Sequence, residues 1–325
     1  MPAATRSVAS KANPSASEAR KPVVYIDGEA GTTGLEIRRR LDKLAGIEVA
    51  SLAPGRRKDD AARLAMMREA DLVVLCLPDR AAIEAAAWLA SLGEEGPKVI
   101  DASTAHRLAD GWVYGFPELT PDQTGWIRAA RRVANPGCYP TGAIALIRPL
   151  VDAGLIPADY PITVNAVSGY SGGGRSMIEA YAAGRAPPFE LYGLGLEHKH
   201  LPELQAYSKL TVRPIFVPSV GNFRQGMLVS VPLHLDALPT KPAARDLEAA
   251  LAEHYAGARL VKLVPADTAD GGRLDGLALN ESDLMELRVF ANEAYRQAVL
   301  VARLDNLGKG ASGAAVQNME LMLGL

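Results

Sequence analysis

The chain has 325 residues, with 35 Lys and Arg against 37 Asp and Glu, so its formal net charge is −2. This balance excludes a basic nucleic-acid-binding protein on electrostatic grounds. A hydrophobic content of 48% with 22% charged residues excludes a globally disordered chain. Two cysteines, Cys76 and Cys138, are too few for a disulfide framework or a thiolate-only zinc site. They fit a reducing, cytoplasmic setting.

Residues 1–21 are predicted to form a flexible tail, because they are rich in Ala, Ser, Pro and basic residues. They lack the apolar segment of about 7–15 residues that a secretory signal needs. An amphipathic transit peptide is disfavoured by the prolines and by Glu18. No stretch approaches the roughly 18 consecutive apolar residues of a membrane helix, so we expect no membrane association.

The first half of the chain alternates short apolar runs with segments of helical spacing. Parallel strands need helical crossovers between them, so this alternation predicts a Rossmann-type, doubly wound parallel sheet. We predict strands at 21–27, 47–52, 71–77 and 98–101, and helices at 33–45, 59–70 and 80–92.

The pattern changes after about residue 160, where apolar runs of strand type predominate. This predicts a second, α+β domain built on a mixed or antiparallel sheet. The expected strands cover 162–166, 210–214, 227–235, 258–264, 284–291 and 297–305, and the expected helices cover 242–255 and 313–323.

A Gly-x-x-Gly-x-x-Gly segment follows the first predicted strand and opens the first predicted helix. Glycines allow a tight turn and a close approach of the backbone to a ligand. The N-terminus of the helix presents free N–H groups to a pyrophosphate. We therefore predict that a dinucleotide binds at Gly28, Gly31, Thr32, Thr33 and Gly34.

The end of the second predicted strand indicates which dinucleotide binds. NAD sites place Asp or Glu there to bind the ribose 2′-hydroxyl, whereas this strand ends at Ser51. Arg56, Arg57 and Lys58 follow, and their charges can pair with the 2′-phosphate of NADP. The pattern favours NADP over NAD, the alternative being a solvated basic loop.

The two cysteines lie in different settings. Cys76 falls within an apolar strand, which favours a packing role. Cys138 follows Gly137 and precedes a helix that has Pro140 in its first turn. A helix N-terminus stabilises a thiolate and lowers the thiol pKa, so we predict that Cys138 is a nucleophile.

A thiolate nucleophile needs an acid/base partner, and the richest histidine cluster is His198-Lys199-His200. His200 is our first candidate for the general acid/base and His198 the second. Glu203 lies three residues after His200 and is expected to orient its ring. The alternative interpretations are an exposed charged turn or a His-x-His metal pair. No third metal ligand is evident nearby, so we predict no metal site.

The sequence resembles the N-acetyl-gamma-glutamyl-phosphate reductases in their shorter form, within the aspartate-semialdehyde dehydrogenase-like group. The matching segments occur in the order found in that family and cover nearly the whole chain outside the tail. They are IDGEAGTTGLEIRRRL (26–41), DASTAHRL (101–108), ANPGCYPTGAIAL (134–146), VSGYSGGGR (167–175), EHKHLPEL (197–204), VGNFRQGMLVSVPLHL (220–235) and DNLGKGASGAAVQNMELM (305–322).

The resemblance implies an NADPH-dependent reduction of N-acetyl-gamma-glutamyl phosphate to N-acetyl-L-glutamate 5-semialdehyde in arginine biosynthesis. Cys138 would displace phosphate from the acyl phosphate and form a thioester. Hydride transfer would give a thiohemiacetal, and His200 would relay the proton when it collapses to the aldehyde. Dry surroundings would protect the thioester from hydrolysis.

Further polar residues complete the predicted site. Ser103 and Arg107 follow the fourth strand at the ligand-binding edge of the sheet, and Arg175 ends a glycine run that can wrap an anion or act as a flexible linker. Matching to the family adds Asn135, Ser168, Gly169 and His198 to the substrate site. It adds Asn306, Lys309 and Gly310 to the cofactor site.

The resemblance also implies discontinuous domains, because the C-terminal helix would pack back on the nucleotide domain. The expected division is a Rossmann domain at 22–138 plus 306–325 and a catalytic, substrate and oligomerisation domain at 139–305. Homodimers or homotetramers are expected. The longer family form has a Ser-Arg pair after the second strand, whereas Leu52 follows Ser51 here, so the 2′-phosphate ligand stays open.

Two alternatives to this function remain at the level of the sequence. A sister reductase acting on aspartyl or aminoadipyl phosphate would share these motifs, because specificity lies in a few pocket side chains. A non-catalytic dinucleotide sensor would share the Rossmann scaffold, since fold does not imply function. Cys138 at a helix N-terminus, with His200 available, argues against the sensor.

Overall fold

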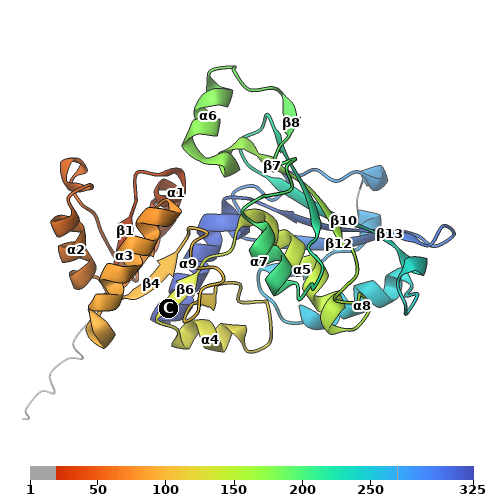
Figure 1. Cartoon of the computed structure of the whole chain (residues 1–325), viewed down its shortest axis with the longest axis horizontal. Helices are drawn as coiled ribbons and strands as arrows, with labels where there is room; N and C mark the ends of the chain where they lie inside the picture. Colours follow the sequence, from red (N-terminus) through yellow and green to blue (C-terminus); the bar gives the residue numbers. More distant parts are fainter. Residues whose placement is uncertain (1–19, 269) are drawn as a thin grey trace, which may run out of the picture.

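The structure is a computed structural model that describes residues 20–268 and 270–325. The predicted tail at 1–21 therefore lies almost wholly outside the described residues. Two β-sheets lie beside each other along the long axis of the molecule (Figure 1). Each sheet carries its own helices, and the chain returns to the first sheet at its C-terminal end.

The first sheet is fully parallel, with the strand order β2-β1-β3-β4-β6-β5, which confirms the predicted doubly wound architecture. Its strands are β1 (Val23–Asp27), β2 (Glu48–Ala50), β3 (Leu72–Leu75), β4 (Lys98–Asp101), β5 (Val113–Tyr114) and β6 (Arg132–Ala134). Its helices are α1 (Thr32–Leu41), α2 (Asp60–Glu69), α3 (Asp79–Ser91), α4 (Gln123–Ala129) and the C-terminal α9 (Gly313–Leu323).

Both faces of this sheet are covered because successive side chains of a strand point to opposite faces. Ile26 packs in one buried cluster with Ile37 of α1 and Met319 of α9. The neighbouring Tyr25 packs in another cluster with Met67 of α2. The near-continuous apolar run in β1 is therefore explained by burial on both sides.

The second sheet is mixed, with the order β11-β12-β13-β10-β7-β9-β8, as predicted for the α+β half. Its strands are β7 (Thr163–Gly169), β8 (Phe189–Leu191), β9 (Ile215–Gly221), β10 (Met227–His234), β11 (Val261–Leu263), β12 (Met285–Asn292) and β13 (Gln297–Leu304). The helices of this half are α5 (Cys138–Asp152), α6 (Gly174–Ala182), α7 (Leu201–Tyr207) and α8 (Ala244–His254).

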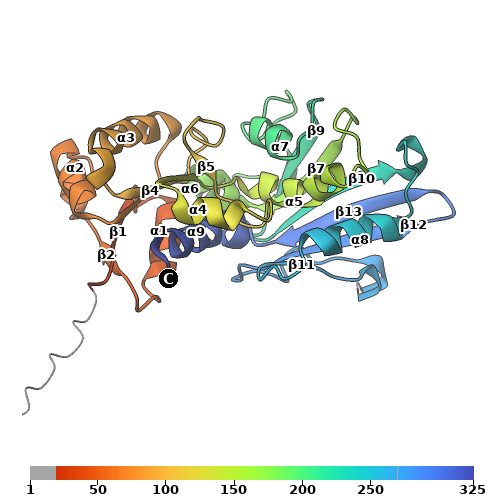
Figure 2. The same cartoon turned by 90° about the horizontal axis from the view of Figure 1, so that it is seen from below.

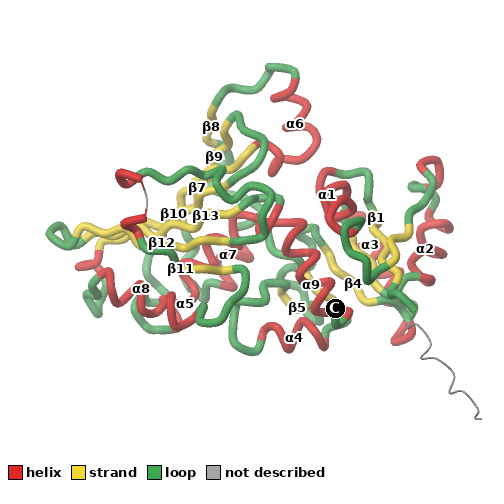
Figure 3. Tube along the Cα trace, turned by 180° about the vertical axis from the view of Figure 1, so that it is seen from behind, coloured by secondary structure: helices red, strands yellow, loops and turns green. Residues whose placement is uncertain are grey.

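One face of the second sheet is covered by helices. In β10, Met227, Val229 and Val231 are buried against this helical layer, which includes α5 and α8. The intervening positions of β10 are more exposed, which gives the alternation of a sheet covered on one side. Figure 3 shows α6 and β8 as a lobe that stands out from the body of the molecule.

The helix α9 lies at the junction of the two halves (Figure 2). It packs against α1, α4 and β4 of the first sheet, and the turn that precedes it packs against α5 and β13. The last segment of the chain thus joins the two sheets beside the region where the sequence places the reactive groups.

The strand predicted at 210–214 is wrong. Leu210 is buried at the end of α7, where its N–H bonds to the carbonyl of Gln205 at 3.0 Å after Lys209 adopts a positive φ of 58°. The strand begins only after Pro214, as β9, and pairs with β7 in parallel. Apolar content alone did not distinguish a buried helix end from a strand.

Candidate active site

Cys138 is the first residue of α5 and follows a sharp turn after β6. Gly137 precedes it as the helix N-cap in an extended conformation. The thiol faces a cavity of about 360 Å³ whose lining also includes Arg107, His198 and His200. The predicted nucleophile and both predicted acid/base candidates therefore meet in one cavity.

The thiol of Cys138 is not the activated group that its helix position predicts. The N–H of Tyr139 and the charge of Arg107 lower its pKa, but burial has a larger effect and raises the pKa to about 11. The expectation that the helix N-terminus leaves this thiol with a lowered pKa is wrong. At neutral pH the group is a thiol, so a base must take its proton before attack.

His200 meets that requirement. Its side chain is buried, and burial first, then the charge of Arg107, holds the pKa of the imidazole well below its usual range. The ring is therefore neutral at pH 7 with a lone pair free for a proton, but the lowered pKa makes it a weak base, so the imidazolium needs an anion beside it. A Cβ on Gly137 would lie 2.8 Å from Nε2 of His200, so the ring lies directly against the turn that carries Cys138.

His198 has a supporting position beside His200. Its Nδ1 accepts the backbone N–H of His200 at 3.1 Å, which fixes the backbone that carries the other ring. Burial lowers the pKa of His198 to about 4. Both histidines line the cavity, and His200 is packed more closely against the turn of Cys138.

Glu203 contacts the nucleophile turn rather than the histidine it was expected to orient. Its carboxylate accepts hydrogen bonds from the guanidinium of Arg107, from the hydroxyl of Tyr114 at 2.8 Å and from the N–H of Gly137 at 3.1 Å. Within the described residues, Nδ1 of His200 has no hydrogen-bond partner. The predicted Glu203–His200 pairing is therefore wrong.

Arg107 holds the same turn from the other side. Its Nε donates to the carbonyl of Asn135 at 3.0 Å, while its Nη1 pairs with the carboxylate of Glu203. The Asn135 side chain in turn donates to the carbonyl of Ala311 at 3.0 Å and accepts from Asn318 at 3.2 Å. Arg107 and Asn135 both line the cavity, and both also fix the backbone before Cys138.

The other predicted substrate residues are divided between the cavity and its surroundings. Ser171 and Gly172, which belong to the glycine run that ends at Arg175, line the cavity, and the Ser171 hydroxyl accepts from the Asn306 amide at 2.9 Å. Ser168 and Gly169 end β7 behind this segment and are not lining residues. Arg175 is 81% exposed and pairs with Glu179 at 2.8 Å, so it points away from the cavity.

The glycine turn after β1 forms a second cavity, of about 330 Å³, beside the first sheet. Gly28 has a φ of +92°, and a Cβ there would lie 2.3 Å from the Cys76 carbonyl, so only glycine fits. The turn leads into the N-terminus of α1, with Thr33 lining the Cys138 cavity. The close backbone approach and the free helix N–H groups fit a dinucleotide pyrophosphate, as the sequence predicts.

The basic residues predicted for the 2′-phosphate do not all face this cavity. Arg57 and Lys58 line it, whereas Arg56 pairs with Asp59 at 3.0 Å on the surface. Ser51 accepts a hydrogen bond from the guanidinium of Arg38 at 2.6 Å. Arg38 was missed because it lies on α1, at a distance in sequence from the strand end that signals cofactor choice.

Four more residues were predicted for the cofactor site, three of them after β13 and the fourth being Ser103. Their surroundings differ. Asn306 and Gly310 line the Cys138 cavity. Lys309 is buried and donates to Glu118 and Gln317, both at 2.7 Å, so it points away from both cavities. Ser103 is buried and donates to Asp101 at 2.7 Å, which places it under the strand ends rather than in a cavity.

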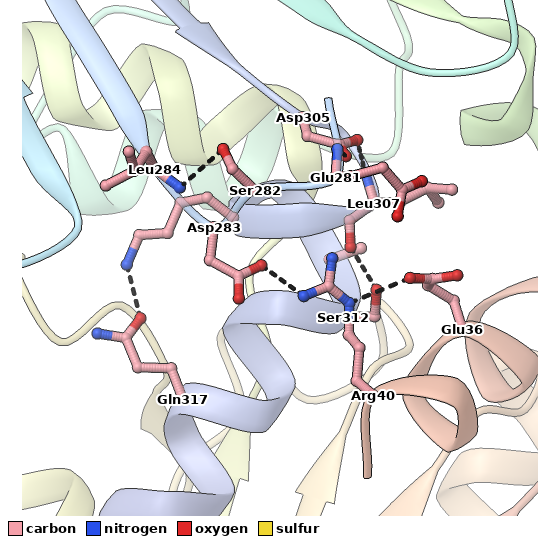
Figure 4. Close-up of polar contacts among 12 residues, drawn as sticks. Glu36, Arg40, Glu281, Ser282, Asp283, Leu284, Asp305, Leu307, Ser312 and Gln317 are labelled. Atoms are coloured by element: carbon pink, nitrogen blue, oxygen red, sulfur yellow. Dashed lines mark hydrogen bonds and ion pairs between the residues drawn. The ribbon is translucent and has the colours of Figure 1, made fainter. Parts of the chain in front are cut away.

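Figure 4 shows how α1 is tied to the second half of the chain. Arg40 of α1 lies 2.6 Å from the carboxylate of Asp283, and Arg39 lies 2.7 Å from Glu281. The N–H of Glu281 also donates to Asp305 at 2.8 Å, at the end of β13. The helix that begins at the dinucleotide turn is thereby fixed relative to the segment that lines the Cys138 cavity.

Comparisons with known proteins identify the group to which this site belongs. Residues 44–127 match the semialdehyde dehydrogenase NAD-binding domain, and residues 138–306 match the semialdehyde dehydrogenase dimerisation domain. The chain is 53% identical to an N-acetyl-gamma-glutamyl-phosphate reductase of Chelativorans sp. over 92% of this chain and 97% of that protein. It is 51% identical to one of Burkholderia ambifaria, over 94% and 97%. The chain belongs to the N-acetyl-gamma-glutamyl-phosphate reductase family.

Solved structures show the same fold for this reductase family member. Aspartate semialdehyde dehydrogenase II of Vibrio cholerae, solved with ASA, superposes with a TM-score of 0.71 at 17% identity, over 94% of this chain and 99% of that one. The NADP complex of the Candida albicans aspartate semialdehyde dehydrogenase gives 0.60 at 15% identity, over 94% and 99%. The predicted two-domain, semialdehyde dehydrogenase-like fold is confirmed.

Across 20–268 and 270–325, no group of three or more His, Cys, Asp and Glu side chains is arranged to hold a metal ion. Within the same described ranges, no helix has the length and apolar character to cross a membrane.

Proposed function

We propose that this reductase family member converts N-acetyl-gamma-glutamyl phosphate to N-acetyl-L-glutamate 5-semialdehyde and phosphate through a thioester on Cys138, with NADPH as reductant. The observation that supports this most directly is the shared cavity of Cys138 and a neutral, buried His200. NADPH, when bound, supplies the hydride that reduces the acyl group. The catalytic assignments of Cys138 and His200 and the positioning role of Glu203 are part of the proposal.

In the first step, His200 accepts the thiol proton, and the sulfur of Cys138 attacks the acyl carbon. The bond from that carbon to the phosphate oxygen breaks, and phosphate leaves with the electron pair. The imidazolium that forms is stabilised next to the departing phosphate. After the acyl group is reduced, the carbon–sulfur bond breaks and the aldehyde leaves, and the proton held by His200 returns to the sulfur of Cys138.

Glu203 and Arg107 act in this scheme by holding the turn before Cys138. Asn135 and His198 complete the cavity wall, and the exposed Lys199 adds a positive charge there for the phosphate group. Ser168, Gly169 and Arg175 stay predictions, because they lie behind or outside the cavity. Lys309 and Ser103 are best explained as supports of the backbone around the cofactor.

NADPH is proposed to bind with its pyrophosphate at the glycine turn and its 2′-phosphate near the end of β2. Arg38, Ser51 and Arg57 are the groups best placed for that phosphate, because they converge beside the cavity of the glycine turn. Arg56 forms a surface ion pair and is not included. The predicted preference for NADP is kept in this proposal. The main cation proposed for the 2′-phosphate is Arg38 of α1, in place of a residue of the loop at 56–58.

We also propose that the domain division runs as the sequence indicates, at 22–138 plus 306–325 and at 139–305. The position of α9 against α1, α4 and β4 supports it. The free thiols of Cys76 and Cys138 suit a reducing compartment, and we propose the cytoplasm.

The chain is proposed to form at least a homodimer through the open face of the second sheet. This face holds an apolar hollow of about 740 Å³ whose lining includes Phe189, Leu191, Phe290 and Val299. The hollow lies within the segment that matches a dimerisation domain. A contiguous apolar surface of this kind marks an interaction site, and a second copy is the occupant that the match supports.

Replacing Val299 with Asp is expected to convert the dimer to monomers. Val299 is 38% exposed on β13, and a charge placed there would be buried unpaired in the interface. Such a charge costs about 3 kcal/mol or more, which is about a hundredfold in the dissociation constant. Sedimentation velocity measures the change, with Ile83→Asp on α3, an apolar side chain that is 54% exposed, as the control. A dimer that survives Val299→Asp would place the interface elsewhere.

The proposed reaction is tested by trapping the acyl-enzyme. The protein is mixed with N-acetyl-gamma-glutamyl phosphate without NADPH, quenched in acid and digested, and the modified peptide is identified by mass spectrometry. We expect one N-acetylglutamyl group on Cys138 and an equal amount of phosphate released. Aspartyl phosphate, run in parallel, is expected to leave Cys138 unmodified. Acylation by aspartyl phosphate alone would assign the chain to the sister reaction.

A further inference from the structure

The adenosine end of the proposed cofactor cavity contains a carboxylate among its cations. Glu29 lies in the glycine turn directly after Gly28 and lines the cavity. Its carboxylate is 3.4 Å from a nitrogen of Arg38 and 3.5 Å from a nitrogen of Arg57, and it accepts the Ser51 hydroxyl at 3.1 Å. An acid at this place is unexpected in a site that has to bind a phosphate.

The distances show that Glu29 is not the main contact that holds Arg38 in place. Arg38 makes shorter contacts with Ser51, at 2.6 Å, and with Asp42 at the C-cap of α1, at 2.8 Å. The contacts of Glu29 to the two guanidinium groups are longer than an ordinary charge-assisted hydrogen bond of 2.7–2.9 Å. The orientation of Arg38 is therefore maintained without the carboxylate.

The side chain of Glu29 is 14% exposed, so solvent screens its charge only in part. A 2′-phosphate at the end of β2 would need the same two guanidinium groups that now face this carboxylate. A second anion next to the phosphate opposes its binding, because like charges repel strongly in a site that water reaches poorly. A carboxylate near a ribose is, in contrast, the group that binds the hydroxyls of NAD.

We propose that Glu29 is a specificity-determining residue whose carboxylate competes with the cofactor 2′-phosphate for Arg38 and Arg57. The same carboxylate accepts the ribose hydroxyls of a cofactor that lacks this phosphate. Glu29 thereby reduces the preference for NADPH over NADH that the cations alone would give. Discrimination of this kind is a difference between two affinities, set by repulsion as well as attraction. The inference rests on the proposed assignment of Arg38, Ser51 and Arg57 to the 2′-phosphate.

The test compares Glu29→Gln with the unchanged protein in the binding of two fragments, measured by calorimetry. The fragments are adenosine 2′,5′-bisphosphate and AMP, which differ by the 2′-phosphate alone. We expect the variant to bind the bisphosphate about three- to tenfold more tightly, the range that removal of one partly buried charge gives. Binding of AMP is expected to stay the same or weaken. The ratio of kcat/KM for NADPH to that for NADH is expected to rise in parallel.

Two further variants make the result decisive. Glu48→Gln removes an exposed carboxylate at the start of β2 and is expected to leave both affinities within twofold. Arg38→Ala is expected to weaken the binding of the bisphosphate at least tenfold and to change the binding of AMP little. Suppose that Arg38→Ala has that effect but that Glu29→Gln weakens the binding of the bisphosphate or leaves it unchanged. The competing role of Glu29 is then wrong, while the 2′-phosphate site stands. If Arg38→Ala does not discriminate between the fragments, the assignment beneath the inference is itself wrong. Acylation of Cys138 is independent of either result.

Discussion

Replacement of Cys138 by Ser is expected to lower kcat by a factor on the order of 10⁴ or more, with the affinity for NADPH unchanged within twofold. A hydroxyl is a far weaker nucleophile than a thiol at the same pH, and loss of a covalent nucleophile in other enzymes has effects of this size. The substitution is small and leaves the turn of Gly137 intact. Steady-state kinetics and cofactor titration by fluorescence measure the two quantities.

Cys76→Ser is the matched control for this prediction. Burial raises the pKa of the Cys76 thiol, followed by the nearby carboxylates of Asp101 and Asp27. Cys76 follows β3 and is not among the residues that line the cavity of Cys138 and His200, so its variant is expected to keep kcat within about twofold. Normal turnover by Cys138→Ser would remove the thioester from the mechanism. Loss of turnover by a well-folded Cys76→Ser would reverse the roles of the two thiols.

Much of the fold could be predicted from the sequence because its signals are local. The run in β1 is apolar on both faces, as a central parallel strand requires, and the glycine turn after it has the spacing of a strand-to-helix connection. The short elements β5, β6 and β8, together with α4 and α6, were not predicted. Strands of two or three residues have no periodicity to detect, and their pairing is decided by neighbours distant in the chain.

The candidate active site was likewise predicted only in part. The sequence placed Cys138 at a helix N-terminus and His200 near it, because short motifs carry both. It gave the wrong direction for the thiol pKa, since desolvation depends on how the whole cavity is packed. It also missed Arg38 and Tyr114, whose contacts with Ser51 and Glu203 join segments far apart in the chain.

Replacement of Glu203 by Ala is expected to destabilise the protein by about 3–5 kcal/mol and to abolish measurable turnover. The change leaves the buried guanidinium of Arg107 without its counter-charge, and an uncompensated buried charge costs that much. It also removes the acceptor for the N–H of Gly137, so the turn before Cys138 loses its anchor. Thermal unfolding is expected to shift down by about 10 °C, taking about 2–4 °C per kcal/mol for a chain of this size.

Glu203→Gln is expected to cost less stability than Glu203→Ala, because its amide oxygen still accepts a hydrogen bond from Arg107 or from the Gly137 N–H. The amide keeps the shape of the side chain but removes a negative charge that raises the pKa of Cys138, while the charge of Arg107 still lowers it. The thiol pKa is therefore expected to fall below about 11, so alkylation by iodoacetamide rises at lower pH than in the unchanged protein. The measurement is made in a Cys76→Ser background so that one thiol reacts. If kcat falls while the alkylation profile moves to lower pH, the thiol ionises more readily than before. The lost activity then reflects the position of Cys138 and not its ionisation. An unmoved profile with normal kcat would show that Glu203 supports the fold alone.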